Sequence, residues 1–192
     1  MIFLFGGSFD PPHLGHVAVV EQVQKLFPNL EKLYILPNYI SPLKKDSRFS
    51  KSEIRDMLSW NFEKLVSSKI QIDFREWENT SPSYTIDTLK SFLEENPNQK
   101  YALILGDDSI SQLHLWKNIS ELLEILSMIL VFKRNQEIPN LPHELSRFAE
   151  KFFYLDNSIY PVSSTDIMKD PIPLKNYLEH RTYEFLRMRT AC

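Results

Sequence analysis

Two histidines close to a pair of glycines are the residues best suited to chemistry in this chain. Gly6 and Gly7 end a short apolar run, and His13 and His16 lie three residues apart where a helix is expected to begin. Such a pair shares one side of a helix. Glycine lets the backbone approach a ligand closely, a helix N-terminus offers free N–H groups, and imidazoles donate hydrogen bonds to phosphate oxygens. The pattern therefore predicts an anion site.

A plainer interpretation is that a strand, a loop and a helix need glycines in any case and that the histidines only cap the helix. The use of glycine argues against it. At an average usage of about 7%, a chain of this length would carry about 13 glycines, but this one has four. Three of them, Gly6, Gly7 and Gly15, fall within ten residues. The flexible backbone is concentrated where a ligand could approach, which favours the functional interpretation.

The elements that must position these residues follow from the hydrophobic pattern. Short apolar runs predict strands at residues 2–5, 33–36, 101–105, 128–132 and 152–155, and an alternating pattern predicts one at 70–74. Between them, helical patterns are expected from Pro11 and Pro12, from Ser50 with Glu53 as a capping box, after Pro82, towards Trp116, over 120–126, from Ser163, and near the end of the chain. The alternation predicts an α/β fold with a doubly wound, mostly parallel sheet of about six strands, in a single domain over residues 1–192.

Four loops rich in turn residues and polar groups each follow a predicted strand. Their sequences are GGSFDPPH, PNYISPLKK, GDDS and PVSST. Because ligands bind beyond the carboxyl ends of the strands in such sheets, these loops are expected to line one crevice.

Composition excludes several other classes of protein. The net charge of −3 gives no sign of nucleic-acid binding, no apolar run approaches 18 residues, and the start MIFLFGG lacks the features of a signal peptide. The only cysteine is Cys192, so a cysteine metal cluster is excluded. We therefore expect a cytoplasmic protein with small-molecule substrates and no membrane partner. The sequence leaves the oligomeric state open, with a homodimer as one option.

The segment GGSFDPPHLGH resembles the signature of the nucleotidylyltransferases that carry the HxGH motif, and its GSFDP-x-H-x-GH form is similar to that of nicotinate-nucleotide adenylyltransferases. This resemblance implies a Rossmann-like fold and transfer of an adenylyl group from ATP to nicotinate mononucleotide, a step of NAD biosynthesis that releases pyrophosphate. It implies His13 and His16 as catalytic residues, and Mg²⁺ that enters with ATP and is held mainly by the triphosphate rather than by protein ligands.

The resemblance also implies a set of ATP-binding residues in the loops after the strands. They are Gly6, Gly7, Ser8, Phe9, His13, His16, Gly106, Asp108, Arg134, Ser163, Ser164, Thr165 and Lys169. The stretch VSSTDI resembles the family's ISSTxIR, but Met168 stands where the family has arginine. Whether Lys169 or Arg134 replaces that arginine stays open, as does the plainer role of Asp107 and Asp108 as helix caps.

A second implied set would bind the nicotinate mononucleotide. Its members are Lys44, Ser83, Tyr84, Thr85, Trp116 and Lys117. The stretch PSYT opens a helix whose main-chain amides would hold the nicotinate carboxylate, and this start offers no obvious acceptor for the amide of nicotinamide. Lys44 matches the family only in part, because Leu43 stands where histidine is usual.

Two alternatives remain at this stage. A phosphopantetheine adenylyltransferase is disfavoured by His13, where that family usually has threonine, and by PSYT. A nucleotide-binding regulator without turnover is kept open by Met168.

Overall fold

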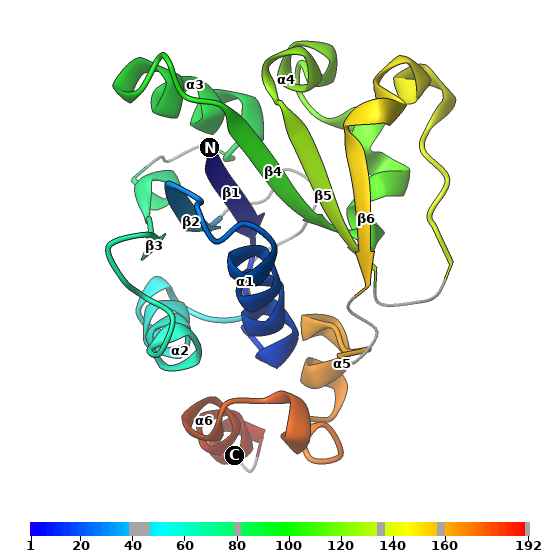
Figure 1. Ribbon diagram of the computed structural model, residues 1–192. Coiled ribbons are helices and arrows are strands. Elements are labelled where there is room, and N and C mark those ends of the chain that lie inside the picture. The colour runs from blue at the N-terminus through cyan, green and yellow to red at the C-terminus, as the bar shows by residue number, and fades with distance from the viewer. Residues whose placement is uncertain (39–46, 79–81, 134–136, 157–159, 191–192) are drawn as a thin grey trace.

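The computed structural model describes residues 1–38, 47–78, 82–133, 137–156 and 160–190. Its centre is a six-stranded sheet with the strand order β3-β2-β1-β4-β5-β6 (Figure 1). All neighbouring strands are parallel. The strands are β1 (Ile2–Gly7), β2 (Lys32–Pro37), β3 (Ile70–Ile72), β4 (Tyr101–Gly106), β5 (Met128–Lys133) and β6 (Phe152–Asp156).

Helices connect the strands. The α-helices are α1 (Leu14–Leu26), α2 (Lys51–Phe62), α3 (Thr85–Glu95), α4 (Ile119–Ile125), α5 (Ser164–Lys169) and α6 (His180–Thr190). The 3₁₀ segments are η1 (Arg75–Trp77), η2 (Asp107–Leu115), η3 (His143–Lys151) and η4 (Lys175–Tyr177). The predicted α/β class and doubly wound sheet are confirmed, whereas η3 has no counterpart in the sequence prediction.

All six predicted strands are present, but β3 is shorter than expected. It ends at Ile72, and the prediction that it continues to Phe74 is wrong. The reason lies in Asp73, whose carboxylate accepts from the backbone N–H of Arg75 at 2.9 Å and so opens η1. An aspartate that caps a turn competes with continuation of the strand.

The sequence predicts two helix starts correctly and places two others too early. Ser50 and Ser163 are N-caps, and each side chain accepts from the backbone N–H three residues on. In contrast, α1 begins at Leu14 with His13 as N-cap, so Pro11 and Pro12 precede the helix. Likewise α3 begins at Thr85, because Tyr84 is still extended.

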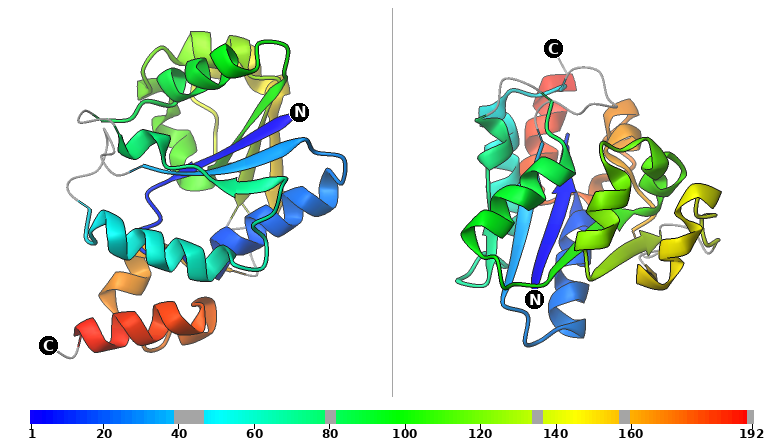
Figure 2. Two further views of the ribbon diagram at one scale, coloured as in Figure 1. Left: turned by 90° about the vertical axis from the view of Figure 1, so that its left-hand side faces the viewer. Right: turned by 90° about the horizontal axis from the view of Figure 1, so that it is seen from above.

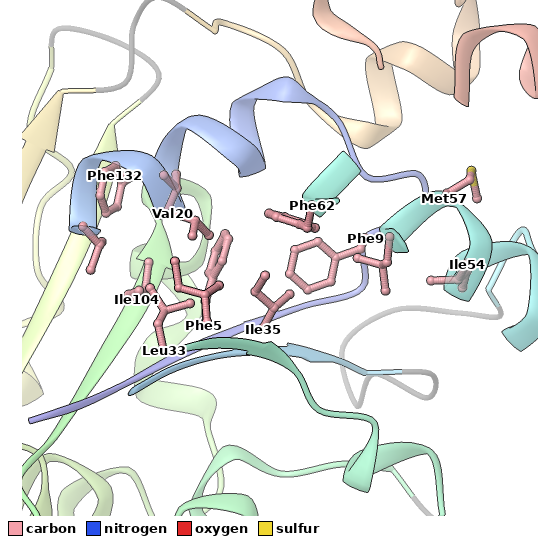
Figure 3. Packing of buried hydrophobic residues seen from close by; sticks show 14 of the residues in the cluster. Phe5, Phe9, Val20, Leu33, Ile35, Ile54, Met57, Phe62, Ile104 and Phe132 are labelled. Atoms are coloured by element: carbon pink, nitrogen blue, oxygen red, sulfur yellow. The ribbon is translucent and has the colours of Figure 1, made fainter. Parts of the chain in front are cut away.

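The side chains of β1 separate two hydrophobic clusters, one on each face of the sheet. Phe3 and Phe5 belong to the cluster under α1, α2 and α6, where Figure 3 shows Phe5 among Phe9 and Val20. Ile2 and Leu4 belong to the cluster covered by α3, α4 and η3. Figure 2 shows these two helical layers on opposite faces of the sheet. Alternate residues of a strand point to opposite faces, and both faces are buried, which explains the continuous apolar runs.

The chain leaves β1 towards β2 on one side, and β4 pairs with β1 on the other. The strand order therefore reverses at β1 and β4, and their carboxyl ends are where a sheet of this type opens a crevice for ligands.

Candidate active site

Two adjoining cavities lie at the carboxyl ends of β1 and β4. The first, called here the large cavity, has a volume of about 340 Å³, and the second, the small cavity, has about 150 Å³. They share lining residues from the two strand ends, namely Gly6, Gly7, Ser8, Leu105, Gly106, Asp108 and Ser109. The two spaces therefore meet at the end of β1, where the paired glycines lie.

The small cavity collects most of the residues that the sequence resemblance assigned to ATP. Those that line it are Gly6, Gly7, Ser8, Phe9, His13, His16, Gly106, Asp108, Ser163, Ser164 and Thr165. Lys169 does not line it, and Arg134 lies outside the described residues. Segments from both ends of the chain thus form one wall.

His13 and His16 form a stacked pair at the start of α1. Their ring centroids lie 3.8 Å apart, and the backbone N–H of His13 donates to Nδ1 of His16 at 3.2 Å. Because Nδ1 of His16 accepts this hydrogen bond, the neutral ring carries its proton on Nε2. The other nitrogen of His16 is therefore a hydrogen-bond donor.

The two rings are held in place by close packing. A Cβ atom at Gly15 would lie 2.9 Å from the His13 ring, so only glycine leaves room for that ring. The Phe9 ring contacts His16 edge-on at a centroid distance of 4.9 Å. Phe9 itself is buried with φ at 47°, an uncommon conformation for a bulky residue that surrounding contacts must hold.

The start of α5 joins the histidine loop through side-chain contacts. The Ser164 hydroxyl donates to the carbonyl of Pro11 at 2.8 Å, which brings residues 153 positions apart together. Ser163 caps the helix by accepting from the backbone N–H of Asp166 at 3.1 Å. These contacts direct the first turn of α5 at the small cavity.

The two positions in doubt on α5 have different surroundings. Met168 is partly buried and packs against the cluster under α1 and α2. The ammonium group of Lys169 lies 3.3 Å from Asp166, and its side chain is 73% exposed. In this arrangement the position of the family's arginine serves packing, and the neighbouring lysine faces solvent.

The large cavity has the N-terminus of α3 in its wall. Ser83, Tyr84 and Thr85 line it, as the resemblance implied. The N-cap is Tyr84, whose side chain cannot accept from the first turn as serine or aspartate would, and no side chain of the described residues caps α3. This helix is 11 residues long, and backbone N–H groups in its uncapped first turn are available to an anion.

Trp116 and Lys117 line the same cavity. Trp116 is half-buried, so part of its ring surface is available for stacking. Lys117 lies 2.8 Å from Asp87 and 4.7 Å from the centre of the Tyr84 ring. Lys44 lies outside the described residues, so its predicted phosphate contact stays a prediction.

The structure adds residues that sequence reasoning missed. Glu76 and Thr88 line the large cavity, and Tyr160 lines the small one. Glu76 is 9% exposed, and its carboxylate accepts from the Thr88 hydroxyl at 2.7 Å. Burial raises the pKa of Glu76, and the hydrogen bond from Thr88 opposes this. The sequence signal was only a glutamate between arginine and tryptophan, and nothing local says that it faces inward.

Metal ligands of protein origin are scarce. Among the described residues, no group of three or more His, Cys, Asp or Glu side chains is arranged to hold a metal ion. The polar groups that face the small cavity are imidazoles, hydroxyls and backbone amides, together with the carboxylate of Asp108. This set of donors suits phosphate oxygens rather than a bare cation.

Residues 4–170 match the family model described as cytidylyltransferase-like. A relative in Leptospira interrogans, named "Probable nicotinate-nucleotide adenylyltransferase", is 36% identical over 86% of this chain and 82% of its own length. The chain belongs to this nucleotidylyltransferase family, among the nicotinate-nucleotide adenylyltransferases. A Listeria monocytogenes relative of the same name is 30% identical over 96% of this chain and 93% of its own length.

Solved structures show the same fold in this family. The Plasmodium falciparum nicotinic acid mononucleotide adenylyltransferase complexed with NaAD has a TM-score of 0.76 at 21% identity and covers 98% of this chain and 95% of its own. The complex of that enzyme with APC gives a TM-score of 0.75 at 20% identity, with the same coverage. The Rossmann-like fold that the sequence predicted is confirmed.

Proposed function

We propose that the protein transfers the adenylyl group of ATP to nicotinate mononucleotide, giving nicotinate adenine dinucleotide and pyrophosphate. The observation that carries this function is the meeting of two cavities at Gly6 and Gly7, the last residues of β1. The stacked histidines and the start of α5 face one cavity, and the uncapped start of α3 and Trp116 face the other. A transfer between two nucleotides needs two such sites side by side.

In this assignment ATP occupies the small cavity and the mononucleotide the large one. A phosphate oxygen of the mononucleotide forms a bond to the α-phosphorus of ATP, while the bond from that phosphorus to the oxygen bridging to the β-phosphate breaks. The electron pair leaves with pyrophosphate. Such a reaction needs no protein nucleophile, and catalysis consists of positioning and charge stabilisation.

The histidines have the geometry for that stabilisation. The Nε2–H of His16, set by the hydrogen bond at Nδ1, would donate to the α-phosphate where charge develops. His13 and the hydroxyls and amides at the start of α5 would hold the leaving phosphates. Loss of one preorganised donor of this kind typically costs about 3 to 4 kcal/mol, or about 10²-fold or more in rate.

The donors present fit a Mg²⁺ ion that arrives with ATP. Mg²⁺ retains several waters and takes few protein ligands in such sites, so phosphate oxygens would be its main partners, and Asp108, which lines both cavities, is the candidate for a carboxylate ligand. When bound, the ion would neutralise phosphate charge. The chain's own residues would orient the two nucleotides.

The start of α3 would select the mononucleotide. Its free N–H groups and positive dipole end suit the nicotinate carboxylate, and the Trp116 ring would stack on the pyridine.

No helix in the described ranges is long and apolar enough to cross a membrane. A single domain, a cytoplasmic location and a homodimer stay predictions.

The test is a pyrophosphate-release assay with ATP, Mg²⁺ and one acceptor at a time, with the dinucleotide identified by mass. Nicotinate mononucleotide should be turned over and phosphopantetheine should not. Turnover of phosphopantetheine alone would favour the alternative enzyme. ATP binding without pyrophosphate release from any acceptor would instead indicate a regulator.

A further inference from the structure

The 3₁₀ turn η1 directs Glu76 into the large cavity. Such a turn has three residues per turn, so its three residues point in three directions. Arg75 is held by Asp73 and Glu95, each at 2.8 Å, and stacks over the Phe92 ring. Trp77 is buried in the hydrophobic cluster under α1, α2 and α6. Because the side chains of Arg75 and Trp77 are held on two other sides of the turn, the side chain of Glu76 faces the large cavity.

The carboxylate of Glu76 lies beside the first turns of α3. Thr88, on the second turn, donates to Oε1 of Glu76 at 2.7 Å, and Ser83 donates to the backbone carbonyl of Glu76 at 3.3 Å. Ser83, Thr85 and Thr88 line the same cavity. A buried acid thus shares a wall with the helix start that the proposed function assigns to the nicotinate carboxylate.

We propose that Glu76 sets the choice between acid and amide substrates through its protonation state. Protonated Glu76 admits the nicotinate carboxylate, whereas ionised Glu76 repels it and accepts a hydrogen bond from the amide of nicotinamide. Two carboxylates in one site raise each other's affinity for protons. Binding of nicotinate mononucleotide is therefore coupled to uptake of one proton from solvent by Glu76. This inference rests on the proposed function.

The cations nearest to Glu76 along the chain and on the cavity wall are paired with other acids. On η1 itself, the neighbouring Arg75 forms ion pairs with two acids, Asp73 and Glu95. From α3, Asp87 is paired with Lys117, which also reaches the cavity wall. Burial is the largest influence on the pKa of Glu76 and raises it, Asp73 raises it further, and Thr88, Ser83 and Arg75 lower it. The approach of a substrate carboxylate would raise it again.

The decisive measurement is the ratio of kcat/KM for nicotinate mononucleotide to kcat/KM for nicotinamide mononucleotide, followed between about pH 5 and pH 9. Both substrates share the phosphate, the ribose and ATP, so the ionisations common to them cancel in the ratio. In the unaltered protein the ratio should fall with rising pH, by up to about tenfold per pH unit above the pKa of Glu76. In Glu76→Gln, which is neutral at every pH, the ratio should stay at its high value.

Glu78→Gln is the matched control, because Glu78 is exposed and only two residues away. Its ratio should follow that of the unaltered protein. Thr88→Val removes the hydrogen bond that lowers the pKa of Glu76, so it should move the fall of the ratio to higher pH. This variant tests the idea even if Glu76→Gln folds poorly.

Calorimetric titration with nicotinate mononucleotide in two buffers of different ionisation enthalpy gives a readout without turnover. Above the pKa of Glu76, proton uptake should accompany binding in the unaltered protein and vanish in Glu76→Gln. If both proteins turn over nicotinate mononucleotide with the same ratio at every pH, this inference is overturned and the proposed function stands. If neither mononucleotide is turned over at any pH, the proposed function itself fails.

Discussion

The backbone N–H of His13 donates to Nδ1 of His16 at 3.2 Å, so the main chain of one histidine decides which nitrogen of the other carries the proton. The donor that remains, Nε2–H of His16, belongs to a ring that lines the small cavity. The same three-residue spacing that places both imidazoles at the start of α1 therefore also sets the tautomer of the second one.

His16→Asn should remove this donor and leave the fold intact. The asparagine oxygen can still accept from the His13 N–H, but no donor remains at the position of Nε2. We expect kcat to fall by about 10²-fold or more with little change in melting temperature. His114→Ala, an exposed histidine on η2, is the control. Near-normal kcat in His16→Asn would remove His16 from the mechanism.

Two glycine substitutions should affect different kinetic parameters. A Cβ at Gly15 would lie 2.9 Å from the His13 ring, so Gly15→Ala should displace that ring and lower kcat. A Cβ at Gly6 meets nothing within 4 Å, so Gly6→Ala should leave the melting temperature unchanged. Its methyl group would occupy the space where the two cavities meet, and we expect KM to rise for both substrates. Unchanged KM values would mean that no ligand approaches the backbone there.

Thr85→Pro offers a test of the helix start in the large cavity. Thr85 is the first residue of α3, where proline is tolerated, and Tyr84 before it is already extended as proline requires. The substitution deletes one N–H and should weaken the preference for nicotinate over nicotinamide mononucleotide, because a hydrogen bond to a charged acceptor contributes about 1.5 to 3 kcal/mol. Thr85→Ala keeps the N–H and should keep the preference.

Trp116→Ala should affect the two mononucleotides alike. Ring stacking does not distinguish an acid from an amide, so kcat/KM should fall for both while their ratio stays constant. A change in the ratio would show that Trp116 contacts the distinguishing group itself.

Lys169→Ala should change the KM for ATP less than twofold, since Lys169 is paired with Asp166 on the exposed side of α5 and does not line the small cavity. A several-fold rise in KM would show that Lys169 turns inward when ATP binds and replaces the arginine absent at Met168. Arg134→Ala, measured in parallel, tests the other basic residue that the sequence offered.

Glu76 should also affect stability in a pH-dependent way. Its pKa in the folded protein lies above the ordinary value of 4.5, so folding favours the protonated acid and its ionisation costs stability as the pH rises through that range. Glu76→Gln should therefore melt at a higher temperature than the unaltered protein at about pH 8. The difference should narrow below pH 4.5, where both side chains are neutral.

The sequence by itself determined the parts that depend on neighbours along the chain. Apolar runs placed five of the strands and alternation placed β3, because side chains on a covered face of a sheet must be apolar. Ser50 and Ser163 marked helix starts because a cap acts within four residues. The glycine and histidine spacing pointed to the anion site for the same local reason. The sequence set two boundaries too early, at Pro11 and Pro82, where an extended residue still had to follow before the helix began.

Only the tertiary structure decided which of these local parts meet. The contact from Ser164 to Pro11 spans 153 residues and exists because the chain returns from β6, at the edge of the sheet, to the segment that precedes α1. The direction of Glu76 depends on where Arg75 and Trp77 are anchored, and one anchor of Arg75, Glu95, is 20 residues away in sequence. Met168 and Lys169 are adjacent in the chain, yet one packs on the core and the other faces solvent. Such choices follow from packing between elements, which no local pattern records.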